Sequence, residues 1–344
     1  MNSSSELTAL PSSFYALVVD KDEQGRITPA VKEITFADLP DGDVTIQVAY
    51  SSLNYKDALA CSPDGNIVKS YPFIPGIDAS GIVVASKDDR YQPGQAVIVT
   101  GYEMGVSHFG GYSQYARVPG DWLVPLPTGL SLRDAMVFGT AGLTAALSVK
   151  RLEQHGIKPE DGQILVTGAS GGVGSLALAM LAKLGYSVTA ASGKKQAEPM
   201  LRALGAAEIV SREAWLPERP RSLDKQKWAG AVDVCGGDIL AAALASVKYG
   251  GAVAASGLTS GGTLPTTVYP FILRGITLYG IDSVYTEQDH RVHVWARTAW
   301  EWSSISQVEG FVNEVTLQEL PALASRMLQS QVMGRTIIRI AHCQ

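Results

Sequence analysis

Four glycines crowd into the ten residues from Val166 to Ser175, VTGASGGVGS, directly after a short apolar run. Gly168, Gly171 and Gly174 stand three residues apart, a spacing that permits a tight turn, a close backbone approach and contact between strand and helix. The amino end of the following helix would present unpaired N–H groups to an anion. The spacing differs from the usual G-x-G-x-x-G, but the flanking strand and helix favour a dinucleotide phosphate site over a simple packing device.

A second segment indicates which dinucleotide would fit. The next expected strand, YSVTAAS, ends at Ser192, and the chain continues with Gly193, Lys194 and Lys195 before it reaches an acid at Glu198. A carboxylate at this tip would hold the ribose hydroxyls of NAD, whereas a hydroxyl and ammonium groups favour a 2′-phosphate. The sequence therefore predicts NADPH as the cofactor. The alternative is a pair of solvated lysines that open a helix.

The segment NYKD, from Asn54 to Asp57, places hydrogen-bond donors and a carboxylate at the expected junction of a strand and a helix. Asn54 and Tyr55 could face a substrate oxygen or supply a proton, and Asp57 could orient them. Alternatively, Asn54 caps the helix and Tyr55 packs on the nicotinamide. The residue types leave both possibilities open, and water could also donate the proton.

The ligands of a catalytic zinc ion do not assemble in the sequence. Zinc takes Cys, His and carboxylate ligands, yet the first 137 residues hold one Cys, Cys61, and one His, His108. Asp78 offers a carboxylate without a neighbouring histidine, and His290 and His293 look like a surface pair. We therefore expect no metal. Without a Lewis acid, hydride addition to a conjugated alkene is easier than to an isolated ketone, because charge spreads to an oxygen that hydrogen bonds can stabilise.

Two scaffolds are expected to position these residues. Residues 14 to about 130 read as short strands broken by Gly, Pro and Asp, which predicts a mainly β, barrel-like lobe. From Gln163 onward apolar strands alternate with helices, which predicts a doubly wound parallel sheet. A pair of helices from Ser131 to Gly156 should bridge the two lobes. The last segment, with a helix and the strand RTIIRIAH, should return to the first lobe.

Composition limits the possible partners and location. The 344 residues are 46% hydrophobic, enough for two domains with their own cores. A net charge of −5 and no run of more than two basic residues argue against nucleic acid and anionic membranes as partners. Three distant cysteines form no disulfide framework. The sequence shows neither a signal peptide nor a membrane span, so we expect a cytoplasmic protein.

Over nearly its whole length the chain resembles the zinc-independent, quinone-oxidoreductase-like branch of the medium-chain dehydrogenases/reductases. The most specific segment, PTTVYPFILRG, resembles the bacterial acryloyl-CoA reductase subgroup. Other segments that carry the resemblance are SSLNYKDALA, PGIDASG, GDWLVPLP, GTAGLTAALSV, TGASGGVGS, WAGAVD, GIDSV and GRTII.

The resemblance implies a GroES-like, mainly β catalytic domain over 1–137 and 284–344, and a Rossmann NADPH-binding domain over 138–283. It also implies a set of residues that contact NADPH. They are Tyr55, Ser170, Gly171, Gly172, Val173, Ser192, Gly193, Lys194, Arg212, Leu258, Ile272 and Ser283. Lys194 occupies a position where the subgroup often has arginine, so a compact ammonium group would replace a planar guanidinium group. The strand ITLYGIDSV would pair with a second copy to give a two-fold homodimer.

The implied activity is NADPH-dependent reduction of the C=C bond of a small 2-enoyl-CoA, acryloyl-CoA to propanoyl-CoA foremost, without metal. Tyr55, Asn54 and Asp57 are the catalytic candidates. A quinone is the alternative acceptor, because members of this subgroup have been labelled quinone oxidoreductases. A non-catalytic NADPH-binding protein is a third possibility. The sequence identifies neither the physiological acceptor nor the proton donor.

Two further groups of residues are weaker candidates for binding the substrate. The phosphates of CoA could meet a cation, and the candidates are Lys56, Lys69 and Arg274. A small acyl pocket could be lined by aromatic side chains that could equally belong to the core. These are Tyr71, Phe73, Tyr102, Phe109 and Tyr112.

Overall fold

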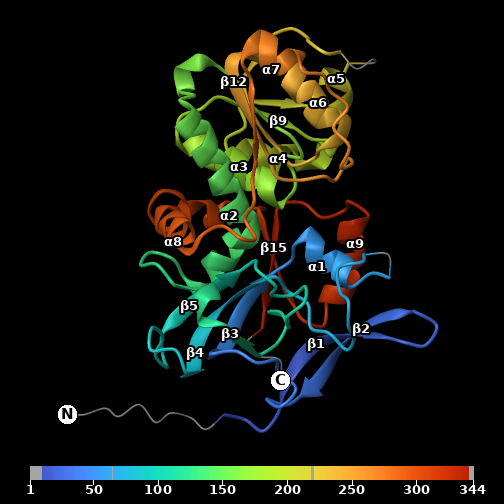
Figure 1. The fold of residues 1–344 in the computed structure, drawn as a ribbon, viewed down its shortest axis with the longest axis vertical. Helices are drawn as coiled ribbons and strands as arrows, with labels where there is room; N and C mark the ends of the chain where they lie inside the picture. The colour runs from blue at the N-terminus through green and yellow to red at the C-terminus, as the bar shows by residue number, and fades with distance from the viewer. Residues whose placement is uncertain (1–9, 64, 218–220, 341–344) are drawn as a thin grey trace.

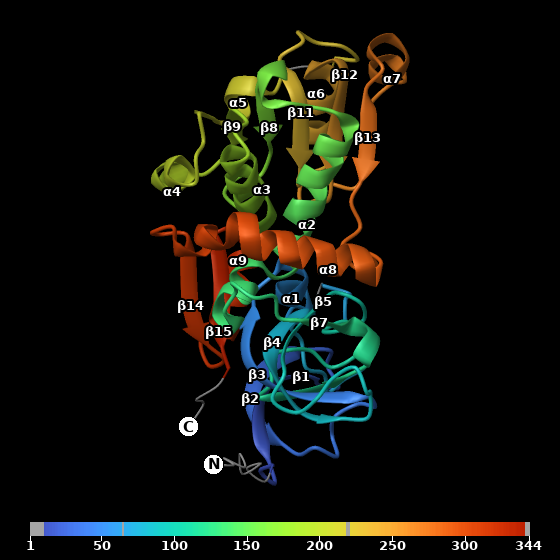
Figure 2. The same cartoon turned by 90° about the vertical axis from the view of Figure 1, so that its left-hand side faces the viewer.

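The computed structural model describes residues 10–63, 65–217 and 221–340, without the side chains of residues 212 and 213. Two lobes lie one above the other along the long axis of the molecule (Figure 1). We call the lower one the β lobe and the upper one the α/β lobe. In the orthogonal view, the helices α8 (Gln288–Arg297) and α9 (Leu320–Leu328) lie at the level where the two lobes meet (Figure 2).

The β lobe is built on a seven-stranded sheet in the order β14-β15-β3-β4-β5-β7, with β6 paired to β3 and a separate β1–β2 hairpin. Its strands are β1 (Phe14–Lys21), β2 (Ile27–Ile34), β3 (Val44–Ser52), β4 (Asp78–Ser86), β5 (Ala96–Thr100), β6 (Tyr115–Val118), β7 (Leu123–Pro125), β14 (Val312–Thr316) and β15 (Arg335–Arg339). β15 pairs antiparallel with β3, and its Ile337 and Ile338 are fully buried. The expected return of the chain end to the first lobe is therefore confirmed, and apolar burial stabilises it.

The α/β lobe contains a six-stranded sheet in the order β10-β9-β8-β11-β12-β13, in which every pair is parallel. Its strands are β8 (Ile164–Val166), β9 (Val188–Ala191), β10 (Glu208–Val210), β11 (Trp228–Asp233), β12 (Val247–Ala255) and β13 (Thr277–Gly280). The strand order reverses between β8 and β11, so a crevice is expected there, outside the carboxyl ends of the strands. The predicted fold class, a Rossmann sheet beside a GroES-like lobe, is confirmed.

The helices complete both lobes. They are α1 (Tyr55–Ala60), α2 (Leu132–His155), α3 (Gly172–Lys183), α4 (Glu198–Ala203), α5 (Arg212–Trp215), α6 (Gly237–Ser246), α7 (Tyr269–Arg274), α8 and α9. The expected bridging pair is one run, α2, broken by non-helical Gly139 (φ 51°, ψ −153°). Ser131 caps its start by accepting a hydrogen bond from the Asp134 N–H, and left-handed Gly156 ends it.

Helix α6 ends at Ser246, and residues 247–251 begin β12. Gly251 lets this strand approach its neighbour β11 closely, because a Cβ atom there would lie 2.4 Å from the carbonyl oxygen of Ala229.

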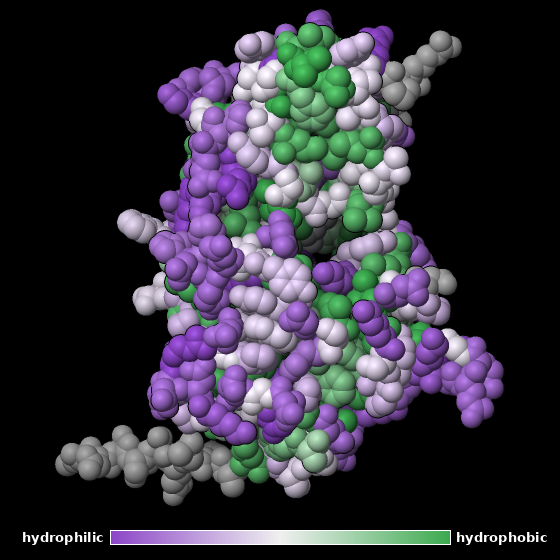
Figure 3. All heavy atoms as spheres, in the orientation of Figure 1, coloured by the Kyte–Doolittle hydropathy of each residue, from purple (hydrophilic) through white to green (hydrophobic). Residues whose placement is uncertain are grey.

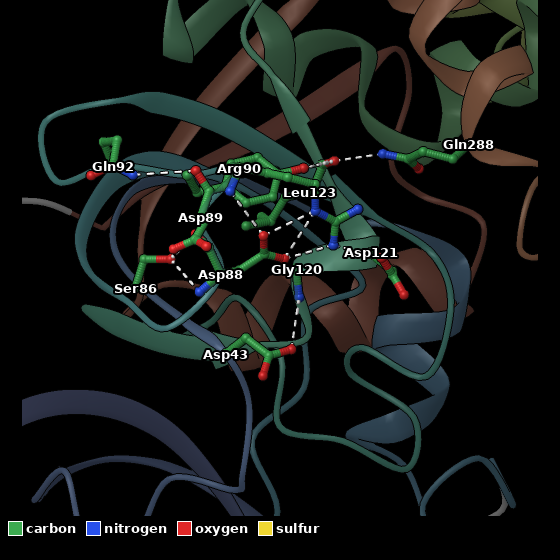
Figure 4. A network of polar contacts seen from close by, with 11 residues as sticks. Asp43, Ser86, Asp88, Asp89, Arg90, Gln92, Gly120, Asp121, Leu123 and Gln288 are labelled. Atoms are coloured by element: carbon green, nitrogen blue, oxygen red, sulfur yellow. Dashed lines mark hydrogen bonds and ion pairs between the residues drawn. The ribbon is translucent and has the colours of Figure 1, made fainter.

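Helix α8 ties the end of the upper sheet to the β lobe. Gln288 donates from its side chain to the carbonyl of Leu123, next to the Arg90, Asp88 and Asp121 ion pairs (Figure 4). One turn further on, the buried Arg291 guanidinium donates to the carbonyls of Thr100, Ser283 and Val284. The segment that leaves β13 is thus fixed against the β lobe.

Candidate active site

The glycine turn lies directly after β8, at the point where the strand order reverses. Gly168 has a left-handed φ of +55°, and Gly171 is the N-cap of α3. A Cβ atom on Gly174 would lie 2.5 Å from the Gly168 carbonyl oxygen, so only glycine lets α3 pack this closely on the turn. Since Gly171 has no side chain to cap the helix, the amides of its first turn, at Gly172 and Val173, are oriented to receive an anion. This geometry fits a pyrophosphate.

The tip of β9 lies beside that turn. Ser192 donates from its hydroxyl to the hydroxyl of Ser170 at 2.9 Å, and the Lys194 N–H donates to the Ser192 hydroxyl at 3.1 Å. Burial lowers the pKa of the Lys194 ammonium, which donates to the carbonyl of Val332 at 2.6 Å. A Cβ atom on Gly193 would meet nothing within 4 Å, so the tip of β9 is open beside this glycine. A hydroxyl, a cation and open space together fit a phosphate.

Other residues that the resemblance assigned to the cofactor also follow the carboxyl ends of strands. Leu258 comes after β12 and is 70% exposed. Ser283 comes after β13, and its buried hydroxyl accepts a hydrogen bond from Thr144 at 2.7 Å. Arg212 begins α5 directly after β10, while its side chain lies outside the described part of the chain. All three therefore start from the edge of the sheet that bears the glycine turn.

Ile272 does not share that edge. It lies on α7, which precedes β13 and therefore stands at the amino ends of the strands, at the far end of the molecule (Figure 1). Its side chain is 69% exposed. A single copy of the chain does not bring Ile272 to the crevice. Arg274 on the same helix is also remote, since its guanidinium donates to the Ala245 and Val247 carbonyls and is not available to CoA.

Two residues of the NYKD segment, Asn54 and Asp57, turn their polar groups inward. Asn54 is the N-cap of α1, and its side-chain nitrogen donates to Asp78 Oδ2 at 2.8 Å and to Asp57 Oδ2 at 3.2 Å. Asp57 is fully buried and accepts from the backbone N–H groups of Asn54 and Ile77. The amide of Asn54 is therefore occupied by carboxylates and does not face a substrate oxygen. In the structure these two side chains contact each other, Asp78 and backbone amides of the β lobe.

Tyr55 is the exposed member of this segment. It is the first residue of α1, and 48% of it is exposed. Helix α1 lies on the side of the β lobe that faces the α/β lobe (Figure 1). The space-filling view shows a hollow between the two lobes (Figure 3). A phenol at this place can donate a hydrogen bond or stack on a planar ligand.

The two buried carboxylates form a pair that sequence reasoning did not foresee. Burial and the neighbouring charge of Asp78 raise the pKa of Asp57 to about 7. Asp78 accepts from the Thr140 N–H at 3.0 Å and from the Thr140 hydroxyl at 2.5 Å. Thr140 directly follows the kink at Gly139. This position requires glycine, because a Cβ atom on Gly139 would lie 2.4 Å from Asp78 Oδ2. The glycine in GTAGLT was the available signal.

Arg335 is the second feature that the sequence did not reveal as functional. It lies on β15, is 2% exposed, and donates to the carbonyl of Val137 at 2.6 Å. A Cβ atom on Gly172 would lie 2.9 Å from its Nη1, so the guanidinium is directly adjacent to the glycine turn. Burial lowers the pKa of Arg335, and Asp78 and Asp57 act in the opposite direction. A buried cation therefore lies between the carboxylate pair and the cofactor crevice.

The aromatic residues proposed for an acyl pocket belong largely to the core. Phe73 and Tyr112 are almost completely buried, and the Tyr112 hydroxyl donates to the Ser52 carbonyl. Phe73 contacts Phe109 edge to face, and Tyr102 stacks on Trp122. The structural alternative, that these rings pack the β lobe, is the one observed for Phe73 and Tyr112.

Within residues 10–63, 65–217 and 221–340, no three His, Cys, Asp or Glu side chains lie together as metal ligands. Cys61 is a half-buried free thiol, while Cys343 and His342 lie outside the described residues. In the same part of the chain, each helix is too short or too polar to cross a lipid bilayer.

Comparison with known proteins gives a consistent assignment. Residues 40–128 match the model of the alcohol dehydrogenase GroES-like domain, and residues 172–300 match that of the zinc-binding dehydrogenase domain. The chain is 52% identical to the putative quinone oxidoreductase YhfP of Bacillus subtilis (95% of this chain, 99% of that one). It is 49% identical to the acrylyl-CoA reductase AcuI of Ruegeria pomeroyi, with the same shares covered.

Solved structures agree closely with the fold. The yhdH oxidoreductase of Salmonella enterica, in complex with NADP, has a TM-score of 0.91 and 49% identity over 95% of this chain and 99% of its own. The structure of Bacillus subtilis YhfP has NAD bound and a TM-score of 0.92 at 52% identity, over 96% of this chain and 100% of its own.

Proposed function

The chain belongs to the medium-chain dehydrogenase/reductase family, and we propose that it reduces the C=C bond of a small 2-enoyl-CoA with NADPH, converting acryloyl-CoA to propanoyl-CoA. The observation that carries the proposal is the tip of β9, which lies beside the glycine turn. It offers the Ser192 hydroxyl and the Lys194 ammonium and has no acidic residue, which favours NADPH over NADH. A relative at 49% identity is named acrylyl-CoA reductase, and the Salmonella enterica structure holds NADP.

The residues of this chain would hold the cofactor along one edge of the upper sheet. Ser170, Gly171, Gly172 and Val173 would receive the pyrophosphate at the start of α3. The 2′-phosphate would lie at the tip of β9, and Arg212, Leu258 and Ser283 would flank the groove. NADPH supplies a hydride when bound. We also propose the two domains that the resemblance implies. The catalytic domain comprises residues 1–137 and 284–344, and the cofactor domain comprises residues 138–283. The first boundary lies beside the kink at Gly139.

In the proposed reaction, the protein must stabilise negative charge on the thioester oxygen of the substrate. Adding hydride to the β-carbon of the enoyl group sends negative charge to that oxygen, and a proton must then reach the α-carbon. Tyr55 is the exposed donor next to the crevice, and we assign it contact with cofactor or substrate. Asn54 and Asp57 hold the first turn of α1 in place from behind. No metal ion is required by this scheme.

A quinone is the second candidate acceptor, and one specific observation favours it. YhfP of Bacillus subtilis, at 52% identity, is named a putative quinone oxidoreductase, and its structure holds NAD. Quinones also accept a hydride with charge placed on oxygen, so the same donors would serve.

We further propose a cytoplasmic homodimer formed at the free edge of β13. The adjacent helix α7 presents an exposed apolar surface, visible at the top of Figure 3. The residues of this surface are Val268, Tyr269, Ile272 and Leu273. An unpaired strand edge next to exposed apolar side chains is the usual arrangement of a subunit interface. Light scattering of the purified protein tests this, and a monomer at micromolar concentration would contradict it.

One steady-state experiment tests the activity. Rates are measured with acryloyl-CoA, crotonyl-CoA and a small quinone, each with NADPH and with NADH. We expect the highest kcat/KM for acryloyl-CoA with NADPH. A higher value for the quinone would make it the acceptor instead. Tight NADPH binding without turnover of any of the three would indicate a non-catalytic protein.

A further inference from the structure

A segment of the β lobe lies against the expected phosphate site of the α/β lobe. Residues 331–334 belong to the connection between α9 and β15, and they contact both parts of that site. The Gly334 N–H donates to the Ser170 carbonyl in the glycine turn at 3.0 Å. The Val332 carbonyl accepts from the Lys194 ammonium at the tip of β9 at 2.6 Å.

Together these contacts close a ring of hydrogen bonds across the two lobes. Within the α/β lobe, the Lys194 N–H donates to the Ser192 hydroxyl, which donates to the Ser170 hydroxyl. Two bonds cross to the β lobe. The Gly334 N–H donates to the Ser170 carbonyl, and the Lys194 ammonium donates to the Val332 carbonyl. The contact between Lys194 and Val332 joins residues 138 positions apart in the chain.

The Lys194 ammonium can donate further hydrogen bonds besides the one to the Val332 carbonyl. A lysine side chain has three N–H donors, and one is used here. Its half-buried stem holds it in place, so little rotamer freedom remains to be lost when an anion binds. The open space at Gly193 gives an anion room to approach from the tip of β9.

We propose that residues 331–334 of the β lobe form part of the 2′-phosphate site, and that Lys194 links the phosphate to the Val332 carbonyl. The inference rests on the proposed use of NADPH and adds a structural consequence. A bound 2′-phosphate holds the ammonium in the position that grips Val332, and so draws the β lobe onto the nucleotide. NADH has no phosphate at this place and leaves the interlobe contact without this support.

Hydrogen–deuterium exchange of the full-length protein tests the link without any substrate turnover. The amides of residues 331–335 are followed with no nucleotide, with saturating NADPH and with saturating NADH. We expect NADPH to slow their exchange about tenfold more than NADH does, because exchange follows the local opening equilibrium. Equal protection by the two nucleotides would overturn the proposal.

Variants separate the link from ordinary phosphate binding. Lys194→Met should lose about ten- to a hundredfold in NADPH affinity, as expected for a charge-assisted contact, with little change for NADH. At saturating NADPH, residues 331–335 of this variant should exchange as they do with NADH. Lys194→Arg should restore much of both effects. The matched control is Lys183→Met, the same substitution at an exposed lysine. Lys183 is the last residue of α3, at the end away from the glycine turn, and this variant should behave as wild type.

The results distinguish this inference from the proposed function. If Lys194→Met loses its NADPH preference but keeps full protection of residues 331–335, the phosphate is bound without the interlobe link and the inference is wrong. It is equally wrong if the variant keeps the preference. If wild type fails to bind NADPH at all, the proposed cofactor itself fails.

Discussion

The side-chain nitrogen of Asn54 lies 2.8 Å from Oδ2 of Asp78, inside the β lobe and behind the residue that faces the crevice. This contact connects the start of α1 to β4, and Thr140 from the kinked α2 joins it from the other side. The position of Tyr55 thus depends on three segments that are distant in the sequence.

Removing the charge of Asp78 should loosen this arrangement. Asp78→Asn replaces an acceptor of several hydrogen bonds with an amide, and we expect the free energy of unfolding to fall by about 1–3 kcal/mol. Because Tyr55 would be less firmly held, kcat should fall as well. Urea unfolding and steady-state kinetics measure both. Thr140→Val, which removes one hydroxyl from the same carboxylate, should cost less, and an equal or larger cost would contradict this account.

Asp57 should make stability fall as pH rises. Its pKa is about 7 in the folded protein, above the usual value near 3.8, so the unfolded chain releases its proton first. The contribution is fully present below pH 4 and is lost as the pH rises through 7. Urea unfolding from pH 4 to 8 should show a steeper decline for wild type than for Asp57→Asn.

Asp38 supplies a control of opposite sign. Hydrogen bonds from Thr35 lower the pKa of this exposed carboxyl, so its contribution is present above pH 4 and is lost as the pH falls. Asp38→Asn should leave the decline between pH 4 and 8 unchanged. A wild-type profile that is flat over this range would show that the pKa of Asp57 is not raised in the folded protein.

Tyr55→Phe tests the role of the phenol. Since the Asn54 amide is occupied by carboxylates, the Tyr55 hydroxyl is the donor that this segment offers to the crevice. We expect kcat to fall about a hundredfold while KM for NADPH changes less than about threefold. Tyr249→Phe, at an exposed tyrosine on β12, is the control. A small effect on kcat would assign Tyr55 to stacking alone.

Gly174→Ala should separate α3 from the glycine turn. The added Cβ atom would lie 2.5 Å from a backbone oxygen that cannot move aside, and we expect a loss of about 1–3 kcal/mol in unfolding free energy. Gly193→Ala places its Cβ atom in open space and should leave stability nearly unchanged. Thermal unfolding of the two variants compares them directly.

Activity should survive metal chelation. The residues that the structure describes hold no cluster of three metal ligands, and the proposed scheme uses hydrogen bonds to stabilise the developing charge. After dialysis against EDTA we expect unchanged kcat with NADPH and acryloyl-CoA. Loss of activity that zinc restores would refute the metal-free scheme.

Local pattern was sufficient for much of this protein. The glycine spacing after β8 and the acid-free tip at Ser192 to Lys194 could be read directly, because a βαβ unit is built from contiguous residues. The helix start at Ser131 and its end at Gly156 were also predictable from capping residues.

Only the tertiary structure brought Asp57, Asp78 and Arg335 near one another, placed Ile272 away from the crevice, and joined Lys194 to Val332. The sequence determined the elements and the type of ligand that they suit, since periodicity, caps and turns act over a few residues. The tertiary structure decided which side chains meet, because contacts between distant segments are set by packing and strand direction, which no local pattern encodes.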